Sequence, residues 1–218
     1  ESSGYSKPFA PKPKLAPQTE SLDWSSKAES IWRKSIKLQG SIAEKYLLNR
    51  GCAIPSGDDI RFLPAYKDGY PALLARFRDA ITSNPISLHF TYLLPDGSCK
   101  APIKPAKKTL FGHRIKGGVI RLTANDEVTT GLGVAEGIET ALTCVKSGWQ
   151  PIWAAGNKSN VADFPILDGI ESLTIFADND ESGAGAKAAT ACAERWLRAG
   201  REVKIILSPK AQSDWNDV

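Results

Sequence analysis

Apolar residues recur at a helical spacing between about Ser26 and Gly51. This spacing predicts two short helices, each with one apolar face. We expect the second helix to end at Gly51, because glycine readily adopts the backbone conformation found at a helix C-terminus. The apolar faces consist of Ala28, Ile31, Trp32 and Ile36 in the first helix and of Ile42, Ala43, Tyr46 and Leu47 in the second.

Between residues 60 and 123 the pattern changes to short apolar runs separated by turn residues. Such runs are typical of β-strands, and the Asp96-Gly97 pair predicts a hairpin turn. Together with the two helices, these strands predict an α+β arrangement with an antiparallel sheet. The expected strands are Ile60–Leu63, Ala72–Asp79, Ile86–Leu93 and Val119–Leu122.

From residue 128 onward, strand-like runs alternate with helical ones. This alternation is typical of a parallel sheet whose strands are joined by right-handed crossover helices. The expected strands are Leu132–Ala135, Pro151–Ala155, Ser172–Ala177 and Val203–Leu207. The expected helices cover residues 137–147, 158–167 and 183–199.

The composition is that of a globular protein, with 42% hydrophobic and 24% charged residues in 218. No run approaches the roughly 20 apolar residues of a membrane span, and the N-terminus lacks a signal-peptide pattern. The four cysteines are scattered, so we expect reduced thiols in a cytoplasmic protein that does not contact membranes. Because methionine is absent, we expect the chain to be a fragment of a longer protein.

Charge divides the chain into a basic and an acidic part. Residues 1–127 hold 20 Lys and Arg against 12 Asp and Glu, whereas residues 128–218 hold 8 against 12. This asymmetry favours a basic part that binds a polyanion and an acidic part that binds a cation, although a chance imbalance of solvated surfaces gives the same count. Residues 1–20 are rich in proline and lysine, which is typical of an extended linker.

The basic excess is concentrated in a segment that contains no acid between Asp96 and Asp126. Its glycines and prolines predict a loop-rich, positively charged surface suited to nucleic-acid phosphates. Aromatic side chains nearby could stack on bases or form the core face of strands, and we favour the core. The seven cations are Lys100, Lys104, Lys107, Lys108, Arg114, Lys116 and Arg121, and the aromatic residues are Phe90, Tyr92 and Phe111.

Acidic side chains follow three of the expected parallel strands. Glu136 follows the first strand, Asp178 and Asp180 follow the third, and Asp214 comes after the fourth. Since ligands of open parallel sheets bind beyond the carboxyl ends of the strands, these carboxylates should meet at one edge. Carboxylates repel one another unless a cation lies between them, and oxygen ligands suit Mg²⁺ or Mn²⁺. The sequence therefore predicts a divalent metal site.

Acids near these strand ends also have ordinary structural interpretations. Asp180 or Glu181 could cap the helix that begins near Ser182. Glu139, one turn beyond Glu136, could face the same edge or be an ordinary solvated residue, which we slightly favour. The two histidines lie far from the acids in sequence and do not support a histidine-based zinc site or triad.

Together these acids resemble the Toprim domain, a catalytic fold shared by bacterial-type primases, topoisomerases and some nucleases. The resemblance covers about 128–218 and includes the small-residue helix Gly183–Ala189. The residues 46–51, Tyr-Leu-Leu-Asn-Arg-Gly, are similar to an element of the basic domain that precedes Toprim in bacterial-type primases. Two residues depart from the pattern of those primases: Thr140 replaces an aspartate, and Asn179 replaces the glycine of Asp-Gly-Asp.

The resemblance implies an α/β Toprim domain with a parallel, Rossmann-like sheet, preceded by a smaller basic α+β domain. We expect a linker tail at 1–25, a basic nucleic-acid-binding domain at 26–127 and a Toprim catalytic domain at 128–218. The implied function is that of a DNA primase core, most similar to primases of phages and mobile elements, which makes short RNA primers by nucleotidyl transfer.

The same resemblance implies roles for particular residues. The implied catalytic residues are Glu136, Asp178 and Asp180, which with Asp214 would bind Mg²⁺ or Mn²⁺. Contacts with nucleic acid or nucleotide are expected from Arg50, Lys100, Lys104, Lys107, Lys108 and Arg114. The expected partners are a single-stranded DNA template, ribonucleoside triphosphates and a replicative helicase, to which such primases are often fused. The roles of Glu139 and Asp217 stay open.

Two other functions compete with the primase interpretation. A Toprim nuclease or nickase would use the same acids to cut DNA with water. A non-catalytic nucleic-acid-binding module would keep the basic part and use the acids only structurally.

Overall fold

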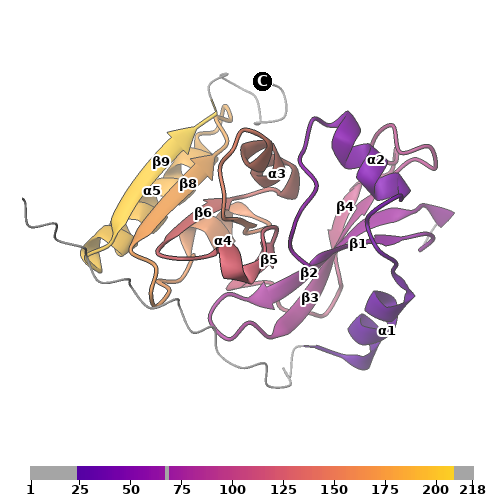
Figure 1. The fold of residues 1–218 in the computed structure, drawn as a ribbon, viewed down its shortest axis with the longest axis horizontal. Coiled ribbons are helices and arrows are strands. Elements are labelled where there is room, and N and C mark those ends of the chain that lie inside the picture. Colours follow the sequence, from indigo (N-terminus) through magenta and orange to yellow (C-terminus); the bar gives the residue numbers. More distant parts are fainter. Residues whose placement is uncertain (1–23, 67–68, 209–218) are drawn as a thin grey trace, which may run out of the picture.

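The computed structural model describes residues 24–66 and 69–208. Nearly all of the predicted linker tail lies outside these residues, and so do Asp214 and Asp217. Within the described residues, nine strands form one mixed sheet in the order β4-β3-β2-β5-β7-β6-β8-β9, with β1 paired to β2 (Figure 1). The sheet thus runs through both parts of the molecule.

The N-terminal part of the sheet is antiparallel, as predicted. β2 (Ala72–Asp79) pairs with β1 (Ile60–Leu63) and with β3 (Pro85–Tyr92). β4 (Lys107–Thr109) adds an edge strand to β3, in a segment that the sequence predicted to be a loop. All three β4 side chains are exposed, so the segment lacks the alternation of apolar and polar residues from which a strand can be predicted.

The C-terminal part of the sheet is parallel, again as predicted. Its strands are β6 (Gly131–Ala135), β7 (Ile152–Ala154), β8 (Ser172–Ala177) and β9 (Glu202–Leu207). β6 lies between β7 and β8, and β9 pairs with β8. The carboxyl ends of these four strands therefore point the same way, which is the condition for a shared ligand site at that edge.

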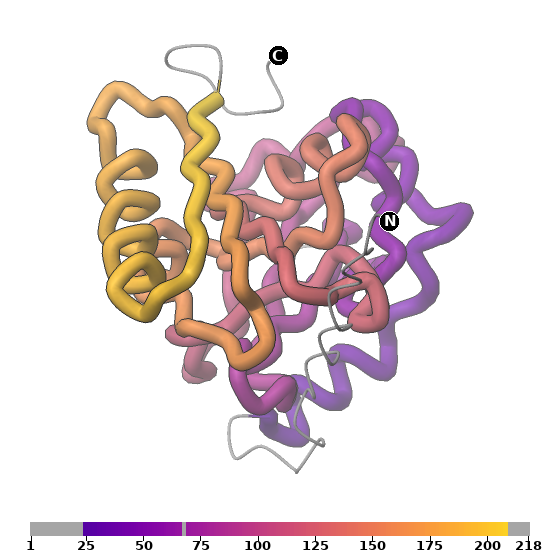
Figure 2. Tube along the Cα trace, turned by 60° about the vertical axis from the view of Figure 1, so that its left-hand side comes forward, coloured from indigo at the N-terminus to yellow at the C-terminus, as the bar shows by residue number. Residues whose placement is uncertain are grey.

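Three helices connect the parallel strands: α3 (Ile138–Lys146), α4 (Lys158–Ala162) and α5 (Ala184–Arg198). Figure 2 shows α5 along one face of the C-terminal strands, where it packs on β8 and β9. α4 is shorter than the expected 158–167, because Pro165 disfavours helical backbone at the residue before it.

The two expected N-terminal helices are present. α1 (Ser26–Lys34) and α2 (Ile42–Asn49) begin after serines whose side chains accept a backbone hydrogen bond from the first turn. Ile36 lies beyond the end of α1 and is exposed, so its assignment to the apolar face was wrong. The buried face of α2 shares one hydrophobic core with α3, and this core joins the two parts of the chain.

β5 (Gly118–Arg121) links the two parts through hydrogen bonds, because it pairs antiparallel with both β2 and β7. The predicted boundary after residue 127 follows the short 3₁₀ helix η2 (Asn125–Glu127), between β5 and β6. Close packing also joins the parts: a Cβ atom on Gly156 would lie 2.3 Å from the ring of Phe77. Only glycine therefore fits at this junction, where φ is +81°.

The aromatic residues of the basic segment divide into two groups. Phe90 and Tyr92 are buried in the core between β3 and its neighbours, as we favoured. Phe111 is 92% exposed, so the core interpretation was wrong for this residue. It follows the edge strand β4, in the turn before His113.

Candidate active site

Two of the predicted acids line one cavity at the carboxyl ends of the parallel strands. Glu136 directly follows β6, and Asp178 directly follows β8. Both line a cavity of about 150 Å³, together with Lys107 from β4, His89 from β3 and Glu139 from α3. The cavity therefore lies between the acidic and the basic part of the chain.

The carboxylates influence one another electrostatically. Burial raises the pKa of Glu136, and the charges of Asp178 and Asp180 raise it further. The charges of Lys158 and Lys107 act in the opposite direction. Glu136 thus lies close enough to both aspartates for repulsion, which a cation would relieve.

Asp180 is already engaged by the protein. Its Oδ2 accepts hydrogen bonds from Lys158 Nζ at 2.9 Å and from the backbone N–H of Gly185 at 3.2 Å, while Oδ1 accepts from the hydroxyl of Ser182. The Ser182 hydroxyl and Lys158 hold the pKa of Asp180 well below its usual range. These contacts stabilise the first turn of α5, which matches the capping interpretation.

Lys158 is a site residue that the sequence analysis missed. It is the first residue of α4, just beyond the carboxyl end of β7, and its Nζ pairs with Asp180. The signal was available, because the residues after every parallel strand, and not only the acidic ones, face the ligand edge.

Glu139 is buried rather than solvated, so the favoured interpretation of this residue was wrong. It is 4% exposed, and its carboxylate accepts hydrogen bonds from the Tyr46 hydroxyl at 2.9 Å and from Lys107 Nζ at 2.8 Å. Lys100 Nζ lies 3.3 Å from the same carboxylate. Burial alone would raise the pKa of Glu139, but Lys107 and Lys100 outweigh it and hold the pKa well below its usual range.

The other predicted nucleic-acid contacts are spread over several surfaces. Lys104 and Lys108 are exposed, and the Lys108 ammonium lies 5.5 Å from the Tyr92 ring centre. Arg114 pairs with Asp79 at 3.3 Å. Arg50 follows the last turn of α2. Of the six predicted cations, Lys100 and Lys107 are the two that pair with a residue of the acid-lined cavity.

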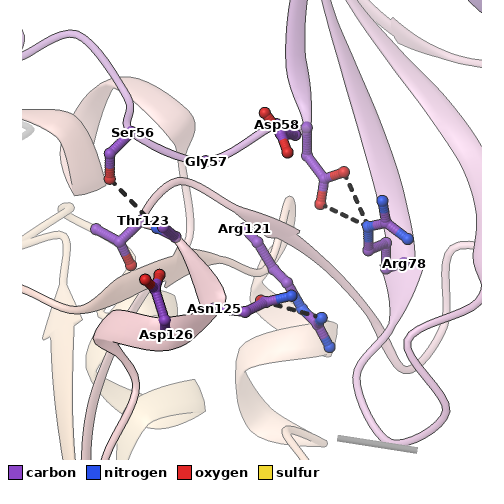
Figure 3. A pocket seen from close by; sticks show the side chains of 10 residues that line it. Ser56, Gly57, Asp58, Arg78, Arg121, Thr123, Asn125 and Asp126 are labelled. Carbon is purple, nitrogen blue, oxygen red and sulfur yellow. Dashed lines mark hydrogen bonds and ion pairs between the residues drawn. The ribbon is translucent and has the colours of Figure 1, made fainter. Parts of the chain in front are cut away.

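Arg121 does not belong to the basic surface, contrary to the sequence prediction. It is 3% exposed, lies over the Trp153 ring and donates hydrogen bonds to Ser83 and Asn125. It lines a second cavity of about 390 Å³ with Asp59 and Arg78 (Figure 3). Arg78 bonds to Asp59 in this cavity and Arg121 bonds to Ser83 and Asn125, so the protein itself already engages the buried charged groups.

No described group of three His, Cys, Asp or Glu side chains is close enough to bind a metal together. Two carboxylates in one cavity nevertheless suit Mg²⁺, which commonly takes one or two protein carboxylates and completes its shell with water and phosphate oxygens. Glu136 and Asp178 therefore fit such an ion. Within the described residues, no helix has both the length and the apolar character needed to cross a bilayer.

The buried imidazole of His89 should make stability depend on pH. Burial lowers the pKa of His89 to about 4, against an ordinary value near 6.5. Because the unfolded chain binds the proton first, stability should fall as the pH drops from about 6.5 to 4, by up to about 3 kcal/mol. Urea unfolding at several pH values should show a smaller loss for His89→Gln than for the matched variant His113→Gln. Equal losses in both would contradict the assignment.

Comparisons with known proteins identify a matching family for each part of the chain. The Toprim domain family matches residues 131–218, and a domain of unknown function, DUF7146, matches residues 23–122. No curated protein matches the sequence.

Among solved structures, the chain is similar to the zinc-binding and RNA polymerase domains of the Aquifex aeolicus primase, with 14% identity and a TM-score of 0.52. That match covers 83% of this chain but 52% of the Aquifex chain, so this chain spans about half of that protein. The DnaG primase catalytic domain bound to single-stranded DNA is similar over 88% of this chain and 73% of its own, with 13% identity and a TM-score of 0.53. At sequence identities this low, the similarity establishes the fold and nothing further. Residues 131–218 of this chain are a Toprim domain, and the described chain has the fold of primase catalytic cores.

Proposed function

We propose that this chain is the core of a DNA primase that makes short RNA primers on single-stranded DNA. The observation that carries the proposal is the cavity in which Glu136 and Asp178 face Lys107. Nucleotidyl transfer needs carboxylates that bind divalent metal and cations that bind the triphosphate, and this cavity offers both. Its position on a primase-like fold supports the same function.

In this proposal Glu136 and Asp178 hold Mg²⁺ or Mn²⁺, which when bound would acidify the attacking 3′-hydroxyl and offset charge on the α-phosphate. Asp180 and Asp214 are the further proposed ligands, although Asp214 lies outside the described residues. Lys158 already pairs with Asp180, so a metal bound by Asp180 would compete with that ammonium for the carboxylate. If Glu136 is not a metal ligand, its alternative role is to accept a proton through water, and its raised pKa suits that role.

The lysines of the basic part bind the anionic substrates in this proposal. Lys107 lines the cavity and would contact the triphosphate, and Lys100, which pairs with the same Glu139 carboxylate, would add positive charge beside it. Lys104, Lys108, Arg50 and Arg114 would follow the template backbone, where contacts with phosphate position the strand without reading its sequence. We also propose the division into domains at 26–127 and 128–218, a cytoplasmic location, a phage or mobile-element origin and a replicative helicase as partner.

The direct test is incorporation of labelled ribonucleotides on a single-stranded template. We expect product that requires Mg²⁺ or Mn²⁺ and all three of protein, template and triphosphates. Incubation with supercoiled plasmid and metal but no nucleotides tests the nuclease alternative, because nicking there would favour hydrolysis. If neither reaction occurs and the protein still binds single-stranded DNA, the non-catalytic binding module becomes the better interpretation.

The exposed ring of Phe111 should contribute to template binding. A phenyl ring that is 92% exposed beside lysines is suited to stacking on an unpaired base. Phe111→Ala should weaken single-stranded DNA binding by about tenfold, a loss within the range measured for one base–aromatic stack. Fluorescence anisotropy with a labelled oligonucleotide measures this. Ile81→Ala, which truncates another exposed apolar residue, is the control, and an unchanged affinity in Phe111→Ala would exclude the stacking role.

A further inference from the structure

Glu139 connects three elements that are far apart in sequence. Its carboxylate, on α3, receives the Tyr46 hydroxyl from α2, Lys107 from β4 and Lys100 from the hairpin that follows β3. The carboxylate side chain is only 5% exposed, whereas the two lysine side chains are 41% and 35% exposed. The carboxylate of Glu139 is therefore buried, and the two lysine side chains extend from the surface to contact it.

The buried carboxylate of Glu139 is fully engaged by donors. Removing a carboxylate from water costs more than a single surface ion pair returns, so a buried acid persists only when several donors surround it. Glu139 has three such donors. Two of them are cations, so the group of Glu139, Lys107 and Lys100 carries a net positive charge at the edge of the cavity.

The lysines keep binding capacity after they pair with Glu139. An ammonium group has three N–H donors, and Glu139 engages one donor of Lys107 through its hydrogen bond. Lys107 also lines the cavity that contains Glu136 and Asp178. An anion in the cavity can thus meet a lysine whose position is already determined by the protein.

Position matters here because a lysine side chain is long and flexible. Ordering a free lysine side chain on an anion carries a large loss of rotamer entropy, and a pre-existing ion pair removes part of that loss from the binding step. Glu139 lies one helical turn after Glu136, on the helix that begins at the end of β6. The lysines are therefore held relative to the same strand end that presents the acid.

We infer that Glu139 is a positioning residue that holds Lys107 toward the triphosphate of an incoming nucleotide, while Lys100 helps to balance the charge of Glu139. This inference rests on the proposed function, since it names the partner of that site. Glu139 does not itself touch the substrate. It acts through Lys107, which lines the cavity, so its effect on nucleotide binding should disappear when Lys107 is absent.

The test is a double-mutant cycle on nucleotide binding rather than on turnover. Calorimetry with ATP and Mg²⁺, without template, measures the affinity of the wild-type protein, of Glu139→Gln, of Lys107→Met and of the double variant. We expect each single variant to bind about tenfold more weakly, as for loss of one charge-assisted contact. The double variant should bind no more weakly than Lys107→Met alone. Lys34→Met, an exposed lysine on α1, serves as the control for loss of charge.

Several results would overturn the inference. Additive losses in the double variant would show that Glu139 acts independently of Lys107. Tighter ATP binding by Glu139→Gln would show that the carboxylate shields the lysines instead of positioning them. If Glu139→Gln does not fold, unchanged affinity in Lys107→Met alone still refutes the inference. Failure of the proposed function is distinguishable, because the wild-type protein would then not bind ATP at all.

Discussion

Asp178→Asn should abolish metal-dependent ribonucleotide incorporation, lowering the rate by at least about a hundredfold. Asp178 lines the cavity with Glu136, and an amide in its place cannot supply the negative charge that holds Mg²⁺. The measurement is single-turnover incorporation on a single-stranded template. Glu181→Gln, which changes an exposed acid three residues away, should retain wild-type activity.

Thermal unfolding separates loss of the metal site from loss of the fold. In the wild-type protein, Mg²⁺ should raise the melting temperature with concentration, because only the folded state presents the site. Asp178→Asn should lose this response. Without metal, it should be at least as stable as the wild-type protein, since Asp178 is one of the charges that raise the pKa of Glu136. Retained incorporation in Asp178→Asn would refute the assignment of this residue.

Asp59→Ala should destabilise the protein by about 3–5 kcal/mol. Asp59 is 2% exposed and pairs with Arg76 at 2.8 Å and with Arg78 at 2.9 Å. Without it, two largely buried guanidinium groups lose the carboxylate that pairs with both of them, and the charge of Arg121 lies nearby. Removal of one member of a buried charge network costs more than the network contributes, because the remaining charges stay desolvated.

Urea unfolding measures this loss. Asp58→Ala is the matched control, because it removes the same group from the adjacent, exposed residue, and its effect should stay within about 0.5 kcal/mol. A loss below about 1 kcal/mol in Asp59→Ala would mean that water or other side chains already solvate the arginines. The primase proposal would be unaffected, because this network lies outside the acid-lined cavity.

The periodicity of the sequence predicted most of the strands and helices, since the spacing of apolar residues follows directly from 3.6 residues per helical turn and two per strand. β8 begins and ends where it was expected, at Ser172 and Ala177. The two exceptions have different causes. β4 contains no apolar residue and exists because its backbone pairs with β3, and the end of α4 depends on Pro165.

By itself, the sequence determined that Glu136 and Asp178 follow parallel strands, and parallel strands present their carboxyl ends at one edge whatever the rest of the chain does. Only the tertiary structure decided which partners the charged side chains meet. Glu139 pairs with lysines that lie more than thirty residues away in the sequence, and Arg121 is buried beside Trp153. Such pairings depend on which surfaces the packed elements bring together. The position of a charged residue in the sequence predicts neither its distant partner nor its burial.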